Sequence, residues 1–258
     1  MWELYDELIA GVPDGLSADK IINGVQNTLV KSNGNYGFVS TRDVAWQPKL
    51  LPKKYEGMPL RELAACIKSW NFAEASIGLA AINAYYNDPE TLRGLGVQIS
   101  SAIQTEDRAS DPFISYQNDI KDKNVAVVGR APYVDKLFAP VCRLFVIESA
   151  DVKTNRKNQT RDEVYPEQAA EYILPDCDFV FIACAALPDK TLPRYLNLAR
   201  KARIILVGQG TTLSPVLHRH GVYDLSGFVV KDGESAEKSA LGLGGNTYSF
   251  GQKVSLKA

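Results

Sequence analysis

The sequence predicts an α/β protein whose first part is α+β and whose second part is a doubly wound parallel sheet. From Asn124 onward, short β-branched segments alternate with helical stretches, which is typical of a parallel sheet covered by helices on both faces. Before position 100, strand-like segments are followed by helical ones, which is typical of a separate α+β domain. A chain of 258 residues is long enough for two modest domains.

The first part opens with a predicted hairpin and continues with two predicted helices. Asn33-Gly34 separates the strand-like residues 20–32 from residues 35–40, and a two-residue type I′ turn needs positive φ at both central positions. Residues 72–86 are apolar almost all round, which indicates a buried central helix. An amphipathic helix is predicted just before it, from an apolar stripe that comprises Leu60, Leu63, Ala64 and Ile67.

The boundary between the two parts is expected near residue 110. The polar stretch 104–111, which ends before Pro112, is interpreted as a linker, and residues 113–120 are predicted to form a short helix that leads into the second part. We therefore expect one domain over residues 1–110 and another over residues 111–258.

The second part is predicted to contain five strands and five helices. The strands are expected at residues 124–128, 143–148, 178–183, 203–207 and 226–230. The helices are expected at residues 132–139, 166–174, 192–201, 214–219 and 234–240. Three of them begin near a proline, whose missing N–H costs nothing in the first helical turn: Pro132, Pro166 and Pro215.

Charge and cysteine usage exclude several classes of function. With 29 basic and 30 acidic residues the formal net charge is −1, so no global field attracts nucleic acid or anionic lipid. The four cysteines include no CxxC pair and are expected to be reduced, buried thiols. The acidic start MWELYDELIA does not resemble a signal peptide, and no apolar stretch is long enough to span a bilayer. We expect a cytoplasmic protein with no membrane or nucleic-acid partner, for which a homodimer is an open alternative.

A glycine turn after the first predicted strand of the second part is the first candidate site. Gly129 occupies the turn position of a dinucleotide fingerprint, whereas Ala131 and Val134 stand where that fingerprint has its other two glycines. Pro132 also removes one N–H from the helix start that would bind a diphosphate. Glu148, nineteen residues after Gly129, is placed to accept from a ribose diol, although an acid at a strand end is common for solubility alone. The missing glycines argue against a standard nicotinamide site.

A second candidate lies between the strand at 203–207 and the next helix. Two glycines and three hydroxyls are joined there to exposed helix N–H groups, which is an anion-binding construction. The candidate residues are Gly208, Gln209, Gly210, Thr211 and Thr212, and Ser214 carries the third hydroxyl. If the strand order is 3-2-1-4-5, the strands at 124–128 and 203–207 are neighbours, and both loops open into one crevice, where Arg130 supplies a guanidinium. The alternative interpretation is that the hydroxyls only cap the helix and the glycines only make the turn.

Two polar residues of the first part are candidates for secondary contacts. Asn83 lies on the apolar helix and must find a buried partner or face a cavity. Thr41 belongs to the polar cluster 40–43 after the hairpin, which is as consistent with a turn as with a site.

No metal ligand and no catalytic residue can be assigned from the sequence patterns. His218 and His220 are the only histidines, and two residues apart on a helix they point to different faces. Cys177 and Cys184 bracket one predicted strand, about 20 Å apart if it is extended, so they cannot share an ion unless the strand bends. No GxSxG elbow is present, so no catalytic residue is assigned.

The chain resembles a known family over nearly its whole length. The stretches NVAVVG, LFVIES, YPEQAAEYILPDCDFVFIACAAL, GQGTTL and KVSLKA resemble the DUF364 family, and EASIGLAAINAYYN resembles its companion module DUF4213. This resemblance implies an enolase-N-terminal-like domain followed by a Rossmann-like domain, a site in the interdomain cleft, and a role in heavy-metal chelation. Relatives tend to carry a GPSTPL-like loop in place of GQGTTL. They often have a glycine-histidine-phenylalanine-proline turn where this chain has Arg130, which argues against that turn as a universal metal ligand.

The leading functional hypothesis is that the interdomain cleft binds a small anionic or metal-chelating molecule. The candidate ligand-binding residues are Thr41, Asn83, Gly129, Arg130, Glu148, Gly208, Gln209, Gly210, Thr211 and Thr212. The expected cargo is a heavy-metal ion or a metal complex. The first alternative is a nucleotide-using enzyme, either an NAD(P)-dependent reductase or an S-adenosylmethionine-dependent transferase, and the second is a metal-binding module without turnover.

Overall fold

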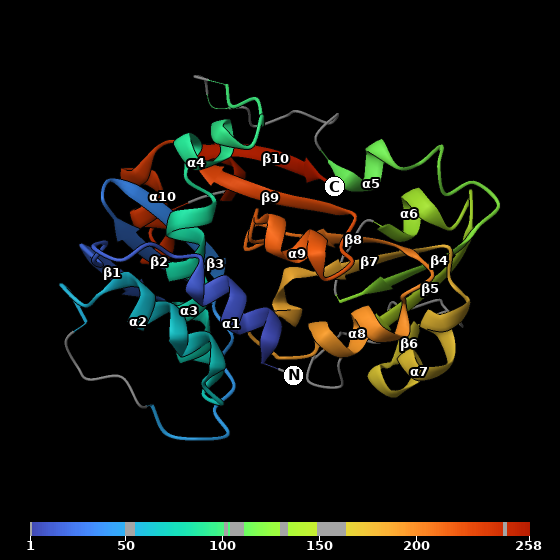
Figure 1. Ribbon diagram of the computed structural model, residues 1–258. Helices are drawn as coiled ribbons and strands as arrows, with labels where there is room; N and C mark the ends of the chain where they lie inside the picture. Colours follow the sequence, from blue (N-terminus) through green and yellow to red (C-terminus); the bar gives the residue numbers. More distant parts are fainter. Residues whose placement is uncertain are drawn as a thin grey trace.

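The computed structural model describes residues 2–49, 55–100, 103, 111–129, 134–148, 164–244 and 247–258. The protein contains a three-stranded sheet and a seven-stranded sheet, and helices pack against both (Figure 1). The strands are β1 (Lys20–Asn23), β2 (Asn27–Ser32), β3 (Asn35–Ser40), β4 (Asn124–Val128), β5 (Arg143–Glu148), β6 (Val164–Pro166), β7 (Phe179–Ala183), β8 (Arg203–Val207), β9 (Asp224–Val230) and β10 (Gly251–Lys257). The helices are α1 (Glu3–Ala10), α2 (Leu60–Ala65), α3 (Phe72–Tyr86), α4 (Pro89–Gly94), α5 (Pro112–Ser115), α6 (Val134–Phe138), α7 (Ala170–Ile173), α8 (Leu192–Leu198), α9 (Pro215–Arg219) and α10 (Gly233–Ala240).

The predicted hairpin is confirmed. Strands β2 and β3 pair antiparallel, with Ser32 opposite Asn35, and the two residues between them have positive φ, 49° at Asn33 and 81° at Gly34. This is the conformation that a type I′ turn requires. The predicted first arm, residues 20–32, is divided by a turn at 24–26 into β1 and β2, so the hairpin is part of a three-stranded meander.

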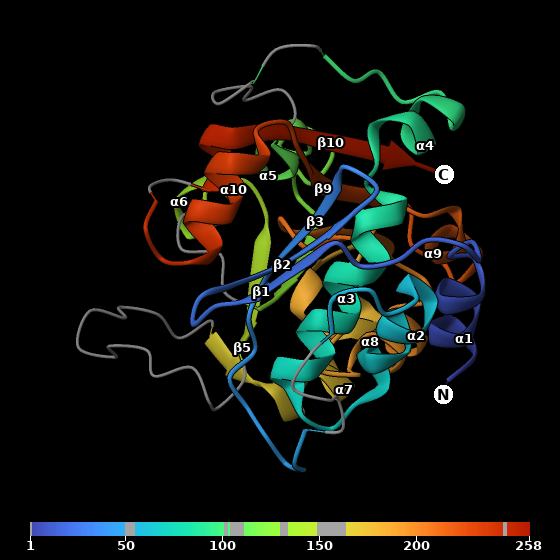
Figure 2. The same ribbon diagram turned by 90° about the vertical axis from the view of Figure 1, so that its left-hand side faces the viewer.

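Helix α3 matches the predicted central helix, and twelve of its fifteen residues are buried. Gly37 of β3 makes its close packing on the sheet possible, because a Cβ there would lie 1.8 Å from the Ala80 carbonyl oxygen. The stripe predicted from Leu60 to Ile67 is also confirmed, since all four side chains are fully buried. Figure 2 shows α10 on the opposite side of the β1–β3 sheet from α3.

The large sheet has the order β10-β9-β8-β7-β4-β5-β6, and its strands β4 to β9 are parallel, while β10 pairs antiparallel with β9. Successive side chains of β4 face opposite layers. Val125 and Val127 pack with residues of α5 and α6, whereas Ala126 and Val128 pack with residues of α7, α8 and α9. Helices thus cover both faces of the large sheet. This explains why its parallel strands consist of continuous apolar residues.

The predicted adjacency of strands β4 and β8 is wrong, because β7 lies between them. Strand β6 was absent from the predicted set, so β7 was counted as the third strand when it is the fourth. Residues 164–166 carry no alternating pattern, and Pro166, which was assigned to a helix start, ends a three-residue edge strand where the missing N–H is tolerated. Strand β10 was not predicted either.

The two sheets share a hydrophobic core. Phe38 of β3 packs edge to face on Phe250, with ring centroids 5.1 Å apart, and Phe250 packs in the same way on Phe228 of β9. Helix α3 lies between the sheets (Figure 1). It accepts a hydrogen bond from the Arg42 N–H of the first half of the chain and donates one to the Gly210 carbonyl of the second half. The boundary at residue 110 stays a prediction, and most of the predicted linker lies outside the described residues.

Two features of the chain bear on its chemistry. All four cysteines carry free thiols, but the expectation that they are buried holds only for Cys177, because Cys66, Cys142 and Cys184 are partly exposed residues. Among the described residues, no helix combines the length and the apolar character that crossing a bilayer requires.

Candidate functional site

A cavity of about 690 Å³ opens between the two sheets, at the carboxyl ends of the parallel strands. Gly129 follows β4, Ile147 lies in β5, Cys184 follows β7 and Gly208 follows β8, and all four line the cavity. The opposite wall comes from the first half of the chain and includes Val39, Ser40, Arg42, Phe72 and Leu79. Since β5 and β7 flank β4 on opposite sides, the cavity lies at the point where the strand order reverses, the usual ligand position in open α/β sheets.

The cavity wall is mainly apolar and aromatic. Phe72, Phe113, Tyr195 and Tyr248 contribute rings to it. Trp46 lines the cavity although 73% of its surface is exposed, which places it at the mouth. Apolar walls with few polar groups are typical of small-molecule sites.

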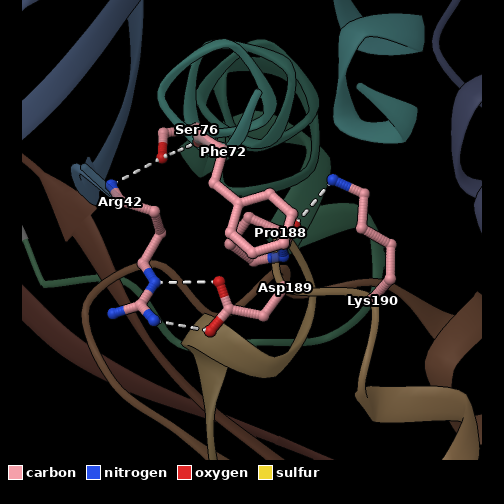
Figure 3. A network of polar contacts seen from close by, with 6 residues as sticks. All are labelled: Arg42, Phe72, Ser76, Pro188, Asp189 and Lys190. Atoms are coloured by element: carbon pink, nitrogen blue, oxygen red, sulfur yellow. Dashed lines mark hydrogen bonds and ion pairs between the residues drawn. The ribbon is translucent and has the colours of Figure 1, made fainter. Parts of the chain in front are cut away.

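An ion pair between Arg42 and Asp189 joins the two walls (Figure 3). Arg42 Nε donates to Asp189 Oδ1 at 2.8 Å, and Nη2 donates to Oδ2 at 2.7 Å, so the pair is bidentate. The Arg42 backbone N–H donates to Ser76 Oγ at 3.0 Å, and Ser76 donates in turn to the Phe72 carbonyl. Helix α3 therefore holds Arg42 through its backbone while the loop after β7 presents Asp189.

The Arg42–Asp189 pair keeps unused binding capacity. Arg42 Nη1 makes no hydrogen bond with the described residues, and a carboxylate has about four lone-pair sites, of which Arg42 fills two. The side chains of Arg42 and Asp189 are 33% and 19% exposed. Burial raises the pKa of the Asp189 carboxyl, while Arg42 acts in the opposite direction.

A second ion pair lines the cavity and comes from the start of α5 and from β10. Lys253 Nζ lies 2.7 Å from Asp111 Oδ2 and 4.6 Å from the centroid of the Tyr248 ring. Asp111 Oδ1 accepts from the Phe113 backbone N–H at 3.0 Å and so caps α5. Asp111 therefore accepts two hydrogen bonds, as Asp189 does, but its side chain is less exposed, 11% against 19%.

The glycines of the 208–212 loop make room for a protein thiol. Gly208 has φ of 126°, and a Cβ there would lie 2.8 Å from Cys184 Sγ. At Gly210 a Cβ would lie 3.3 Å from the same sulfur and 3.2 Å from Val39 Cβ. Burial raises the pKa of Cys184 to about 11, although the Gly210 N–H and the Thr211 hydroxyl oppose the shift. The thiol is therefore protonated at neutral pH.

Two asparagines hydrogen-bond to the polar groups of the same loop. Asn83 lies in α3, and Asn87 follows the C-terminal end of this helix. Asn83 Nδ2 donates to the Gly210 carbonyl at 2.9 Å, and Thr212 Oγ1 donates to Asn83 Oδ1 at 2.6 Å. Asn87 Nδ2 donates to the Thr211 carbonyl at 2.9 Å, and Asn87 Oδ1 accepts from the Leu213 N–H at 2.9 Å. The loop is thus held by protein groups along most of its length.

Comparison with known proteins gives the family. Residues 111–258 match the model of DUF364, and residues 5–86 match the model of DUF4213, both described as "Putative heavy-metal chelation". The chain belongs to the DUF364 family. A DUF364 protein of unknown function from Desulfitobacterium hafniense DCB-2 is similar to it, with 44% identity, a TM-score of 0.88 and coverage of 100% of this chain and 99% of that chain.

A more distant DUF364 structure shares the fold. The protein of unknown function from Pyrococcus horikoshii has 21% identity and a TM-score of 0.75, and the match covers 99% of this chain and 98% of that chain. No curated protein matches the chain. The resemblance to DUF364 and DUF4213 drawn from the sequence is confirmed.

Three of the predicted site residues of this DUF364 protein line the cavity, namely Gly129, Gly208 and Gln209. The Gln209 side chain donates to Asn27 Oδ1 at 3.0 Å and to Ser40 Oγ at 2.9 Å, so it bridges to the first half of the chain. Arg130 lies outside the described residues.

The other predicted residues do not line the cavity, namely Thr41, Asn83, Glu148, Gly210, Thr211 and Thr212. Asn83, Thr211 and Thr212 are fully buried. The Thr41 hydroxyl bonds to Thr28 Oγ1 and the Gly24 carbonyl. For Asn83 the structural alternative accounts for the observed hydrogen bonds. After the 208–212 loop the predicted capping role falls to Ser214 alone, because Thr212 donates to Asn83 instead.

The charged residues that line the cavity, and the thiol of Cys184, were missed. Arg42 was passed over in favour of its neighbour Thr41, and Asp189, Cys184 and Lys253 were not proposed as site residues. One signal was available for Asp189 and Cys184, because both follow a predicted parallel strand at its carboxyl end, where ligands bind in α/β sheets. Nothing in the sequence pairs Arg42 with Asp189.

A bare metal ion does not fit the described residues of the DUF364 chain. No group of three or more His, Cys, Asp or Glu side chains converges within them. The cavity offers a single thiol, Cys184, and carboxylates that are already paired, such as Asp189 with Arg42 and Asp111 with Lys253. His218 and His220 bond to the Val222 carbonyl and to Glu7 and do not line the cavity.

Lys190 fastens the loop that carries Asp189 to the start of α3. It has φ of 62°, and its ammonium group donates to the carbonyls of Ser69 and Pro188, the latter at 2.7 Å (Figure 3). The same group lies 4.6 Å from the centroid of the Phe72 ring. Burial lowers the pKa of Lys190 to about 8.

This buried lysine predicts a pH dependence of stability. Between pH 8 and 10.5 the unfolded chain holds a proton that the folded chain has lost, so the free energy of unfolding rises with pH through this window. We expect wild type to gain roughly 3 kcal/mol relative to Lys190→Met across it, because the folded and unfolded pKa values are about 8 and 10.5 and each pKa unit corresponds to about 1.4 kcal/mol. Urea unfolding at several pH values measures this difference. Lys190→Arg does not titrate in this pH range, so its free energy of unfolding should change with pH as that of Lys190→Met does. If the free energy of unfolding changed with pH in the same way in all three proteins, the lowered pKa of Lys190 would be contradicted.

Proposed function

We propose that the cavity between the two sheets binds a small anionic, metal-chelating molecule. The observation that carries the proposal is the Arg42–Asp189 pair in the wall of a 690 Å³ cavity, where Arg42 Nη1 has no partner among the described residues. The volume falls in the range of about 300–1,000 Å³ that is typical of small-molecule sites. A metal bound here would be held by donors of the molecule itself, because the described residues do not converge into a ligand set.

Each polar group of the wall has a distinct role in this proposal. Arg42 Nη1 binds a carboxylate or phosphate of the molecule, and Asp189 keeps the guanidinium oriented. Lys253 provides a second cation further along the wall. Trp46 covers the mouth. Arg130 remains the predicted additional guanidinium.

The finer fold description is part of the same proposal. Residues 1–110 form an enolase-N-terminal-like domain and residues 111–258 a Rossmann-like domain in a cytoplasmic protein. What supports the second assignment is the order β6-β5-β4-β7-β8-β9, which is 3-2-1-4-5-6 when strands are numbered from β4. The separate family matches over residues 5–86 and 111–258 support the division.

A nucleotide-using enzyme is the second candidate, favoured by the position of the Gly129 turn. Gly129 has φ of 100° and follows β4 at the reversal of strand order, where α/β sheets bind nucleotides. A Cβ at Gly129 would lie 2.6 Å from Ala183 Cβ, so the turn packs closely on the end of β7. Glu148, the expected ribose acceptor, does not line the cavity, which weighs against this candidate.

A ligand panel on purified protein separates the two candidates. Thermal stability is measured with citrate and nitrilotriacetate, each with and without zinc, with zinc chloride alone, with NAD(P)H and with S-adenosylmethionine. We expect chelators to raise Tm in wild type, and Arg42→Gln to weaken their binding at least tenfold. Arg93→Gln, which removes an exposed arginine paired with Glu90, should bind as wild type does.

Other outcomes decide against the proposal. A Tm shift with nucleotides alone would establish the second candidate instead. Zinc chloride that binds stoichiometrically and equally well in wild type and Arg42→Gln would show a bare-ion site and overturn the proposal.

A further inference from the structure

The charged groups of the cavity wall occur mostly as ion pairs, and carboxylates outnumber cations. Among the described lining residues the cations are Arg42 and Lys253, and the carboxylates are Asp111, Glu167 and Asp189. Glu167 is paired with Arg194, which does not line the cavity. A ligand that carried only negative charge would meet the Asp189 carboxylate as well as Arg42, and Asp189 would repel it. The wall therefore complements a ligand that bears both signs of charge.

The Arg42–Asp189 pair has the geometry to bind such a ligand without breaking. Both Asp189 oxygens accept one hydrogen bond each from Arg42, which leaves each oxygen one further lone-pair site. Arg42 retains both N–H donors of Nη1. A carboxylate on Arg42 and an ammonium group on Asp189 would extend the pair into an alternating array of four charges.

Because Asp189 is partly buried, the contact between its carboxylate and the ligand's ammonium group contributes strongly to binding. The Asp189 side chain is 19% exposed, and a charge brought into such a wall is costly unless it is paired. An ammonium group next to the ligand carboxylate compensates the carboxylate of Asp189, whereas a methylene group in the same place would not. The site should therefore discriminate between an amine and its carbon analogue.

We propose that the ligand is an amino-carboxylate, with a protonated amine on Asp189 and an adjacent carboxylate on Arg42. This inference rests on the proposed function and names its ligand class. The same nitrogen and oxygen atoms form the donor set by which amino-carboxylates chelate metals. When a metal ion takes the amine lone pair, a secondary ammonium group gives up one of its two protons. The nitrogen then no longer carries the ammonium charge and keeps a single N–H, so its contact with Asp189 is weakened. The cavity consequently prefers the metal-free form.

The test compares iminodiacetate with glutarate, which has a methylene group in place of the ammonium group and is otherwise the same. Binding to wild type is measured by protein-observed NMR titration at pH 7. We expect iminodiacetate to bind at least tenfold more tightly than glutarate. We also expect one equivalent of zinc, which coordinates the amine and removes its ammonium charge, to reduce this preference.

Two variants assign the contacts. Asp189→Asn should bring the affinities for iminodiacetate and glutarate within about threefold of each other, because the amide no longer attracts an ammonium group. Arg42→Gln should weaken both ligands. The zinc comparison uses wild type alone, so it remains decisive if Asp189→Asn does not fold.

Failure of this inference is distinguishable from failure of the proposed function. Equal binding of iminodiacetate and glutarate to wild type, with both lost in Arg42→Gln, would overturn the amine contact and leave the anion site intact. Equal affinity for free and zinc-loaded iminodiacetate would also overturn it. Binding of citrate and nitrilotriacetate that does not depend on Arg42 would overturn the proposed function itself.

Discussion

Asn87→Leu is expected to lower the free energy of unfolding by about 4 kcal/mol, because it leaves two buried backbone groups of the 208–213 segment without a partner. These are the Thr211 carbonyl and the Leu213 N–H, each 2.9 Å from an Asn87 side-chain atom. Asn87 is 4% exposed, and water cannot replace the lost bonds. Denaturant unfolding of the variant and wild type measures the difference.

Two further variants calibrate this result. Asn197→Leu replaces an exposed asparagine of α8 and should change stability by less than about 0.5 kcal/mol. Asn87→Asp keeps the acceptor for the Leu213 N–H but places a buried carboxylate oxygen against the carbonyls of Thr211 and Phe228, so its loss should be at least as large. A loss below about 1 kcal/mol in Asn87→Leu would mean that the asparagine does not hold the loop.

Gly208→Ala is expected to destabilise the protein by about 3 kcal/mol, for two separable reasons. Its φ of 126° is unfavourable for an L-residue, which costs about 1–2 kcal/mol. The new methyl group would also lie 2.8 Å from Cys184 Sγ, and overpacking of this kind costs about 1–3 kcal/mol. Denaturant unfolding again provides the measurement.

The contribution of the thiol can be isolated with Cys184→Ala. If Cys184 Sγ causes the clash, Gly208→Ala should cost at least about 1 kcal/mol less in the Cys184→Ala background than in wild type. Gly15→Ala is the matched control for backbone strain, because Gly15 has φ of 88° and a methyl group added there would meet no heavy atom within 4 Å. Equal costs of Gly208→Ala in both backgrounds would show that the glycine serves the turn alone.

Much of the secondary structure was predictable because its signals are local. The Asn33-Gly34 turn, the buried helix α3 and five strands of the large sheet follow from turn chemistry and apolar periodicity. Strand β6 did not follow, because three residues ending in Pro166 carry neither signal. That omission shifted the strand count by one and produced the incorrect adjacency of β4 and β8.

The site was predictable only in outline. Gly129 and Gly208 line one cavity because the carboxyl ends of parallel strands meet at one edge of a sheet, whichever strand lies between them. Arg42 and Asp189 are 147 residues apart and belong to different halves of the chain, so their pairing leaves no mark on local sequence. The same distance in sequence hid the contact of Asn83 with Thr212, 129 residues away.

The sequence alone establishes the alternation of strands and helices and the hairpin turn, because both depend on neighbouring residues. It also establishes the membership of the DUF364 family, because that depends on stretches of residues that recur in relatives. Only the tertiary structure decided what surrounds the glycines of the 208–212 loop, which accommodate Cys184 and are held by Asn83 and Asn87. It also decided which charges meet in the cavity. Hydrogen bonds and ion pairs act over a few ångströms in space, and folding alone brings such distant positions within that range.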